Sequence, residues 1–214
     1  MKGLFITLEG PDGSGKTTQV SKVADYLAQH HIDFIQTREP GGTRISDKIR
    51  GLILDPEHQE MHDLTEVLLY AASRAQHVHE KIIPNLEQGK VVLCDRFVDA
   101  SLAYQGFGLG VGEERVLQVN NIATSGLVPD RSYFIDVSPQ VGRSRMKARY
   151  GDGNLDRIEQ KDFTYHDRVR EGFQHIFSNN TERIIRINGE QDPDTVFLEI
   201  AKDLEVLLAN HKEK

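Results

Sequence analysis

The sequence contains no tryptophan and only one cysteine, Cys94. A single cysteine excludes an internal disulfide, which suits a reducing compartment. No apolar run is long enough to cross a bilayer, and the N-terminus lacks the pattern of a signal peptide. We therefore expect a cytoplasmic protein that makes no membrane contact. Its cysteine, in the apolar run 91–94, is expected to be an inert core residue.

Basic residues are also outnumbered: the sequence has 26 Lys and Arg residues and 33 Asp and Glu residues, which gives a net charge of −7. A general nucleic-acid surface is therefore not expected, although a local basic pocket for a small phosphate compound is still compatible with this balance. The 214 residues correspond to one large domain, or one domain with a small insertion, and can bury a substantial core. We find no internal repeat, low-complexity segment or linker.

The most informative stretch of the sequence is Gly10-Pro11-Asp12-Gly13-Ser14-Gly15-Lys16-Thr17. It follows the apolar run 4–8 and precedes Val20, Val23, Ala24 and Leu27, which share one helical face. A strand, a glycine-rich turn and a helix are the context that a phosphate-binding P-loop requires. Backbone amides and the helix N-terminus then present partial positive charge to a polyphosphate. Lys16 can reach the β- and γ-phosphates, and the Thr17 hydroxyl can bind Mg²⁺. The plain alternative is a glycine-rich connecting loop.

Strands and helices are predicted to alternate along the whole chain. Apolar runs predict strands at 4–8, 34–37, 91–94, 133–135 and 184–187, and helical periodicity covers 45–53, 63–82, 115–124 and 196–208. This alternation predicts one α/β domain over residues 1–214, a three-layer, doubly wound parallel sheet of the P-loop NTPase type. Ligands of such sheets bind at the carboxyl edge, where Asp95 and Arg96 follow a predicted buried strand.

The segment between residues 141 and 170 differs from the rest in its dense mixture of charges. Positive charge concentrates in an otherwise acidic chain at Arg143, Arg145, Lys147, Arg149 and Arg157. We expect a small, helical, arginine-rich lid at about 142–160. The plain alternative is a solvated charged helix.

Several further motifs occur in a fixed order after the P-loop. They are Thr37-Arg38-Glu39-Pro40-Gly41-Gly42, Ser73-Arg74-Ala75-Gln76-His77, Asp95-Arg96-Phe97, Tyr104-Gln105-Gly106 and Leu155-Asp156-Arg157-Ile158-Glu159. Together with Gly10 to Thr18, these motifs resemble those of the bacterial thymidylate kinases over essentially the whole chain. The resemblance implies transfer of the γ-phosphoryl group of ATP to dTMP, giving dTDP and ADP with Mg²⁺, for dTTP synthesis. It also implies a homodimer formed through neighbouring helices.

The resemblance assigns roles around the phosphates. ATP is expected to contact Gly10, Pro11, Asp12, Gly13, Ser14, Gly15, Lys16, Thr17 and Thr18. Because this loop has no second basic residue, further positive charge is expected from the lid, and Arg145 is assigned to ATP. Arg50 and Arg96 would hold the acceptor phosphate, while Arg149 stabilises the transferred charge. Asp12 would face the acceptor near its 3′-hydroxyl, and Asp95 would assist Thr17 in holding Mg²⁺. The catalytic set is then Lys16, Arg96, Arg149 and Asp12.

The acceptor phosphate needs no general base, because its second ionisation lies near pH 6 and it is already a nucleophile at neutral pH. Catalysis then reduces to aligning and neutralising two phosphate groups that repel each other. The alternative for each arginine is a solvated group or the partner of a carboxylate such as Glu39 or Asp95. Asp95 itself has the alternative of a structural ion pair.

The base of the acceptor is assigned to a second set of residues, again by resemblance. Tyr70 would stack on the thymine face, and Arg74 would contact its polar edge. Ser101 and Gln105 would add hydrogen bonds, while Tyr104 would crowd the ribose 2′ position. Many relatives carry Phe in place of Tyr70, whose hydroxyl needs a partner. Without the surrounding motifs, Tyr70 would be interpreted as a half-buried helix aromatic.

Other functions make different sequence predictions. A deoxynucleoside kinase needs a base for the hydroxyl proton and has no need of Arg50 and Arg96. A GTP-dependent switch predicts an Asn-Lys-x-Asp segment, which is absent. A structural nucleotide-binding protein needs no arginine-rich lid. His77 and His79 do not form a zinc site, because residues two apart do not share a helix face and no set of ligands completes them. We expect both to be solvated or to cap helices.

Overall fold

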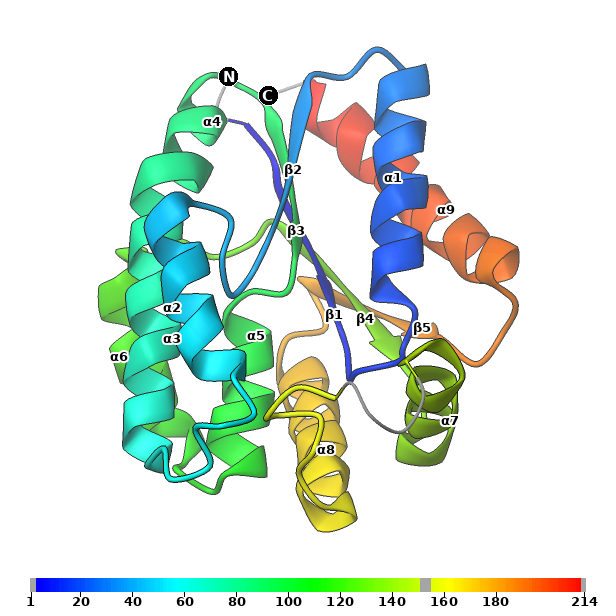
Figure 1. The fold of residues 1–214 in the computed structure, drawn as a ribbon. Helices are drawn as coiled ribbons and strands as arrows, with labels where there is room; N and C mark the ends of the chain where they lie inside the picture. The colour runs from blue at the N-terminus through cyan, green and yellow to red at the C-terminus, as the bar shows by residue number, and fades with distance from the viewer. Residues whose placement is uncertain (1–2, 151–154, 213–214) are drawn as a thin grey trace.

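A computed structural model describes residues 3–150 and 155–212, and in residues 149, 150 and 212 the backbone alone. Five parallel strands form one sheet in the order β2-β3-β1-β4-β5 (Figure 1). The strands are β1 (Phe5–Glu9), β2 (Phe34–Arg38), β3 (Val91–Asp95), β4 (Arg131–Asp136) and β5 (Ile184–Asn188). The doubly wound α/β fold expected from the alternation of strands and helices is confirmed. None of the helices in the described ranges is long and apolar enough to span a membrane.

One face of the sheet is covered by α1 (Lys16–Gln29) and α9 (Pro193–Lys212). The predicted stripe of α1 packs here, since Val20, Val23 and Leu27 are buried against Ile6 and Leu8 of β1. The central strands β1, β3 and β4 are almost entirely buried, as expected for parallel strands with helices on both faces.

The other face carries the remaining helices, apart from α7. They are α2 (Arg44–Leu54), α3 (Asp63–His77), α4 (Ile83–Glu87), α5 (Val98–Ser101), α6 (Glu113–Thr124) and α8 (Phe163–Asn179). Two π-helical segments, η1 (Val78–Ile82) and η2 (Leu102–Gly108), continue α3 and α5. No clear periodicity predicted α8, yet Val169, Phe173 and Ile176 of this helix pack under Phe134 of β4. Dense charge around the helix hides its narrow apolar stripe.

The buried face of α3 differs from the predicted one. Leu64 and Leu68 were expected in the buried stripe, but they are 48% and 58% exposed. Glu66, Arg74 and His77 are buried instead, next to Val67 and Ala71. Apolar periodicity alone places the leucine side of α3 in the core. In the structure, the polar side chains of α3 have buried partners, and these contacts orient the helix.

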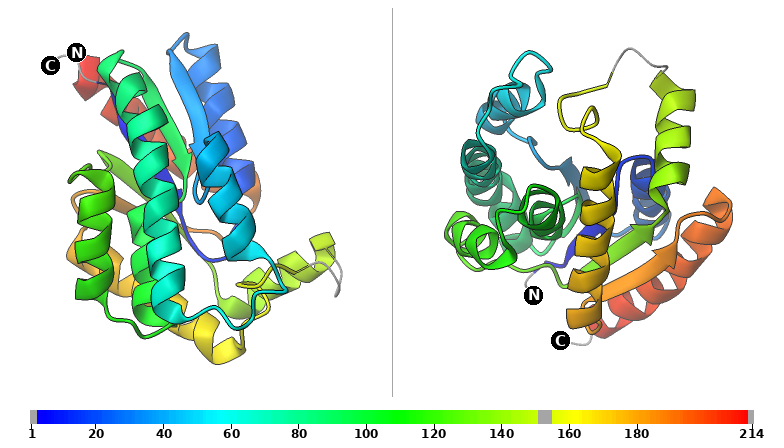
Figure 2. Two further views of the ribbon diagram at one scale, coloured as in Figure 1. Left: turned by 60° about the vertical axis from the view of Figure 1, so that its left-hand side comes forward. Right: turned by 90° about the horizontal axis from the view of Figure 1, so that it is seen from below.

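The carboxyl ends of the strands lie on the side of the molecule that carries α2 and α7 (Pro139–Tyr150), as Figures 1 and 2 show. The connections that leave this edge contain the P-loop after β1, residues 39–43 after β2 and Arg96 after β3. The topology thus gathers motifs from distant parts of the sequence at one edge.

Candidate active site

The P-loop folds as the glycine pattern predicts. Gly10 and Gly13 have positive φ angles of 145° and 76°. A Cβ at Gly13 would lie 2.2 Å from the carbonyl oxygen of Gly142, at the start of α7. A side chain at Gly13 would therefore disturb both the turn and the helix that packs on it. Only glycine fits both requirements.

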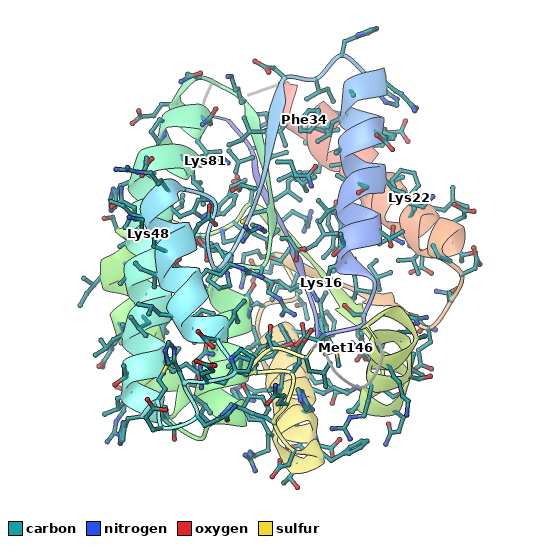
Figure 3. The ribbon with its side chains drawn as sticks, viewed as in Figure 1. Lys16, Lys22, Phe34, Lys48, Lys81 and Met146 are labelled. Atoms are coloured by element: carbon teal, nitrogen blue, oxygen red, sulfur yellow. The ribbon has the colours of Figure 1, made fainter. Side chains whose placement is uncertain are left out.

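Lys16 begins α1 beneath the loop, as Figure 3 shows. Its Nζ donates to the carbonyl oxygens of Gly10 and Pro11, at 3.0 and 2.9 Å. Burial and the nearby positive charge of Arg96 lower the pKa of Lys16 to about 8, although Asp95 and Asp12 oppose the shift. The ammonium is thus poised beside the phosphate cradle, and anionic oxygens placed there would stabilise its charged form.

A large open cavity of about 1820 Å³ lies in front of this loop. Among the residues predicted to bind ATP, it is lined by Asp12, Gly13, Gly15, Lys16, Thr17, Thr18 and Arg145. Gly10, Pro11 and Ser14 instead lie behind the cradle, where their oxygens accept from Lys16. The donor cavity, as we call it, therefore brings most of the predicted ATP set to one surface.

Thr17 and Asp95 line this donor cavity together. Thr17 is exposed, while Asp95 Oδ1 is buried and has no hydrogen-bond partner among the described residues. A hydroxyl and an unsatisfied carboxylate fit Mg²⁺, which keeps several waters and binds few protein oxygens beside substrate phosphates. Within the described ranges there is no cluster of three or more His, Cys, Asp or Glu residues that would suit a metal held by protein alone.

Arg96 stands where the donor cavity meets a second cavity. Its guanidinium donates to Asp12 Oδ1 at 2.5 Å, to Tyr104 Oη at 3.2 Å and to the Gly10 carbonyl at 2.9 Å. Tyr104 Oη in turn donates to Asp12 Oδ2 at 2.8 Å. Burial alone would raise the pKa of Asp12, but Arg96 and Lys16 outweigh it and hold this pKa below its usual value. Asp12 is therefore a fixed anion that orients Arg96.

The backbone at Arg96 is itself held in an uncommon conformation. Its φ is +69°, in the left-handed region. The next amide, Phe97 N–H, donates to Glu9 Oε1 at 2.7 Å, with Glu9 buried at the end of β1. This contact fixes the turn that aims Arg96 across the strand ends.

The second cavity, which we call the acceptor cavity, has a volume of about 530 Å³. All eight residues predicted to bind the acceptor line it: Asp12, Arg50, Tyr70, Arg74, Arg96, Ser101, Tyr104 and Gln105. They come from the P-loop, α2, α3, the turn after β3, α5 and η2. Arg50 lines both cavities and donates to the Pro40 carbonyl at 3.0 Å.

Arg74 is almost fully committed to protein partners. Its Nε donates to Glu39 Oε2 at 2.6 Å, and its Nη1 donates to Ser101 Oγ at 2.9 Å and to Asn120 Oδ1. Its Nη2 donates to the Phe97 carbonyl at 3.0 Å. Arginine has five N–H donors. Among the described residues, four of them are therefore occupied, and one on Nη2 is left for a ligand.

Glu39 and Asn120 are site residues that the sequence interpretation missed. Glu39 lies inside a quoted motif but was considered only as a generic arginine partner. Asn120, on α6, is far from every motif and gave no local signal. Glu39 also accepts from His77 Nδ1 at 2.9 Å. Burial alone would raise the pKa of Glu39, but Arg74 and His77 outweigh it and lower this pKa.

Three other interpretations need correction or concern a side chain outside the described residues. His77 was expected to be solvated or capping, but it is fully buried and its Nε2 lies 2.7 Å from Thr37 Oγ1. Arg157 was counted with the lid's positive charge, but it is buried against Glu66 at 2.7 Å. Arg149 belongs to α7, and its side chain lies outside the described residues. Arg145, also on α7, donates to the Gly189 carbonyl at 2.9 Å.

Comparison with known proteins identifies close relatives. The family model for thymidylate kinase matches residues 8–200. The thymidylate kinase of Exiguobacterium sibiricum is 51% identical over 204 residues, covering 95% of each chain. That of Oceanobacillus iheyensis is 46% identical and covers 100% of this chain and 94% of its own. The crystal structure of thymidylate kinase from Ehrlichia chaffeensis superposes with a TM-score of 0.78 at 35% identity, covering 96% of this chain and 99% of that one.

Proposed function

The chain belongs to the thymidylate kinase family of nucleoside monophosphate kinases, and we propose that it transfers the γ-phosphoryl group of ATP to dTMP, giving dTDP and ADP. The observation that carries this proposal is the meeting of two cavities at Asp12 and Arg96. One cavity has the backbone cradle of a triphosphate site, and the other is lined by arginines and closed by aromatic and amide side chains. A donor and an acceptor bound there would face each other across Arg96.

Positioning and charge neutralisation account for the chemistry. At neutral pH the acceptor phosphate is mostly dianionic and attacks without a general base. Arg50 and Arg96 line the junction and would hold this phosphate against its repulsion from ATP. Lys16 would contact the transferred group from the donor side. Arg149 is proposed to approach from the lid, whose limits of about 142–160 stay a prediction.

Mg²⁺ is the cofactor that we assign to Thr17 and Asp95. When bound there, the ion would neutralise negative charge on the phosphates during transfer. The unsatisfied Asp95 oxygen supports this assignment, because a buried carboxylate without a partner is costly unless something binds it.

Thymine, like uracil, has a polar edge that matches what the acceptor cavity offers. Arg74 has one N–H donor left, which suits a carbonyl oxygen at the 4 position. Gln105 Oε1 is buried without a partner among the described residues, and it suits the N3–H group beside that carbonyl. Tyr70 would stack on the ring. Tyr104, tied to Asp12, would crowd a ribose 2′-hydroxyl and so favour deoxynucleotides.

The test is release of ADP from Mg-ATP with dTMP, dUMP, thymidine, AMP, CMP and GMP offered separately. We expect turnover with dTMP to exceed that with the other acceptors. Faster turnover with thymidine or with a purine nucleotide would leave the P-loop assignment standing and remove the roles of Tyr70, Arg74 and Gln105. ADP released equally fast without any acceptor would contradict the kinase function itself.

A homodimer is proposed on the face formed by α3 and α6, which pack against each other. This face exposes the apolar side chains of Leu64, Leu68, Leu117 and Ile122. Leucines that break the buried pattern of α3 are explained if a second copy covers them. Sedimentation equilibrium of the protein and of Leu68→Glu tests this, since a charge in the interface should shift the protein toward monomer. The cytoplasm stays the predicted location.

A further inference from the structure

Gln105 is held from behind by a buried ion pair. Its Nε2 donates to Glu66 Oε1 at 3.0 Å, and the other oxygen of Glu66 accepts from Arg157 Nη2 at 2.7 Å. Gln105 and Glu66 are each 1% exposed, and Arg157 is 3% exposed. Gln105 lines the acceptor cavity, whereas Glu66 lies outside its lining. The ion pair thus binds the amide nitrogen of Gln105 and leaves the amide oxygen available to a ligand.

The chemistry of Glu66 determines which group of the Gln105 amide, the NH₂ or the oxygen, faces the carboxylate. A carboxylate that pairs with a buried arginine is ionised and can only accept hydrogen bonds. The amide of Gln105 must therefore turn its NH₂ group to Glu66. Its oxygen is then directed away from Glu66, and this is the buried Oε1 that has no partner in the described part of the chain. An ordinary glutamine can flip its amide, but here a flip would place oxygen against carboxylate.

We propose that Glu66, held by Arg157, is the positioning residue that makes Gln105 an acceptor and so lets the enzyme recognise a pyrimidine with N3–H. The inference rests on the proposed function and deepens its base recognition. Thymine and uracil carry N3–H, while cytosine carries a lone pair at N3. The oxygen of Gln105 attracts the first and repels the second. A buried polar group left unpaired can discriminate strongly between such ligands.

Arg157 also connects the Glu66–Gln105 contact to the segment after residue 154. Its Nε donates to the Ile53 carbonyl at 2.8 Å, and its backbone N–H donates to the Leu54 carbonyl at 3.1 Å. Arg157 is thereby anchored to the end of α2, and it presents one N–H to Glu66. The orientation of Gln105 therefore depends on residues from α2, α3, η2 and the segment after residue 154.

The substitution Glu66→Gln tests the orientation directly. Arg157 would take the carbonyl oxygen of the new amide, which leaves its NH₂ group to donate toward Gln105. Gln105 would then flip and present NH₂ to the base. We expect kcat/KM for dTMP to fall, kcat/KM for dCMP to rise, and their ratio to drop by at least about tenfold. The change for dTMP should lie mainly in KM, because the phosphates are not touched.

Glu66→Asp is the matched control. It shortens the side chain but keeps an acceptor-only carboxylate, so the dTMP/dCMP ratio should be retained even though the packing is disturbed. In a Gln105→Ala background, Glu66→Gln should leave the ratio unchanged, because no amide remains to be flipped. An unchanged ratio in folded Glu66→Gln overturns the proposal. So does an equal drop in Glu66→Asp or in the Gln105→Ala background.

A measurement on the unaltered, unliganded protein avoids any question of folding. In protein labelled with ¹⁵N-glutamine, the side-chain NH₂ protons of Gln105 should exchange with solvent far more slowly than those of exposed Gln88. Exchange at the same rate as Gln88 would contradict the proposal. Because no nucleotide is present, this result is independent of whether dTMP is the acceptor.

Discussion

The donor and acceptor cavities adjoin each other, yet they are built in opposite ways. The donor cradle comes from one short stretch of chain, and its ligand groups are backbone amides beside exposed Thr17 and Thr18. The acceptor cavity draws on eight segments, and its key polar groups are buried and already bonded to one another. A cradle of amides recognises phosphate, which every nucleotide carries. A pocket whose polar side chains are mostly bonded to one another recognises only ligands that match the few donors and acceptors still free.

Arg96→Ala should have the largest effect, because it removes a cationic side chain that lines both cavities at their junction. Arg96 contacts Asp12, Tyr104 and the P-loop carbonyl of Gly10. We expect turnover with ATP and dTMP to fall by roughly a hundredfold or more, as for the loss of one preorganised transition-state contact, and Lys16→Ala to do the same. The measurement is kcat at saturating substrates, with folding checked by thermal unfolding.

The matched control for Arg96→Ala is Arg44→Ala, since Arg44 is exposed at the start of α2 and lines neither cavity. It should keep normal turnover. A folded Arg96→Ala enzyme with near-normal turnover would remove Arg96 from the mechanism, and the two cavities would then function independently.

This contrast also explains how far the sequence could predict the site. The P-loop was predictable from the residues alone, because its function depends on backbone turns that glycine spacing encodes locally. Ser101 and Gln105 were assigned only through resemblance to a family. Nothing in the sequence indicated that Glu39 and Asn120 hold Arg74, because these partners meet only when α3, α6 and the turn after β2 pack together.

The fold shows the same limit. Strands were found because parallel, doubly covered strands are continuous apolar runs, as at Val91–Asp95. The buried face of α3 was misplaced at Leu64 and Leu68, and His77 was placed on the surface, because buried ion pairs oppose the apolar periodicity. Pairing energy depends on a partner elsewhere in the chain, which periodicity cannot detect.

Asp95→Asn should affect the donor side alone. Loss of the carboxylate charge weakens the proposed Mg²⁺ site, so we expect the Mg²⁺ concentration for half-maximal rate to rise about tenfold or more. The dissociation constant for dTMP, measured by calorimetry without metal, should change little. Asp33→Asn is the control, because Asp33 is exposed and precedes β2, at the opposite edge of the sheet. Equal Mg²⁺ requirements in the Asp95→Asn and unaltered enzymes would exclude Asp95 as a ligand.

Raising the pH should weaken ligand binding in the donor cavity but not in the acceptor cavity. The pKa of Lys16 is lowered to about 8, so its ammonium loses a proton as pH rises through 8, and ATP binding weakens above that value. In contrast, the nearby Tyr104 and Asp12 outweigh burial and raise the pKa of Arg96, so this guanidinium stays charged. Between pH 7 and 9 we expect affinity for ATP to fall by up to about tenfold, while affinity for dTMP stays nearly constant.

Binding isotherms over this pH range check the prediction without involving turnover. Lys16→Arg retains a positive charge at pH 9, so in a folded variant the ATP profile should be flatter. If the affinities for ATP and dTMP fell in parallel, one group shared by both cavities would be titrating. The two cavities would then not differ in how their charge responds to pH.

Tyr70→Phe should have the smallest effect, and it distinguishes the ring of Tyr70 from its hydroxyl. Tyr70 lines the acceptor cavity, and within the described residues its hydroxyl has no hydrogen-bond partner. Removing the hydroxyl should change KM for dTMP by less than about twofold, whereas Tyr70→Ala removes the stacking surface and should raise KM by roughly tenfold. If Tyr70→Phe instead costs as much as Tyr70→Ala, the hydroxyl contacts the nucleotide. The acceptor cavity would then offer three polar groups to the base instead of two, and Arg74 and Gln105 could not account for its selectivity alone.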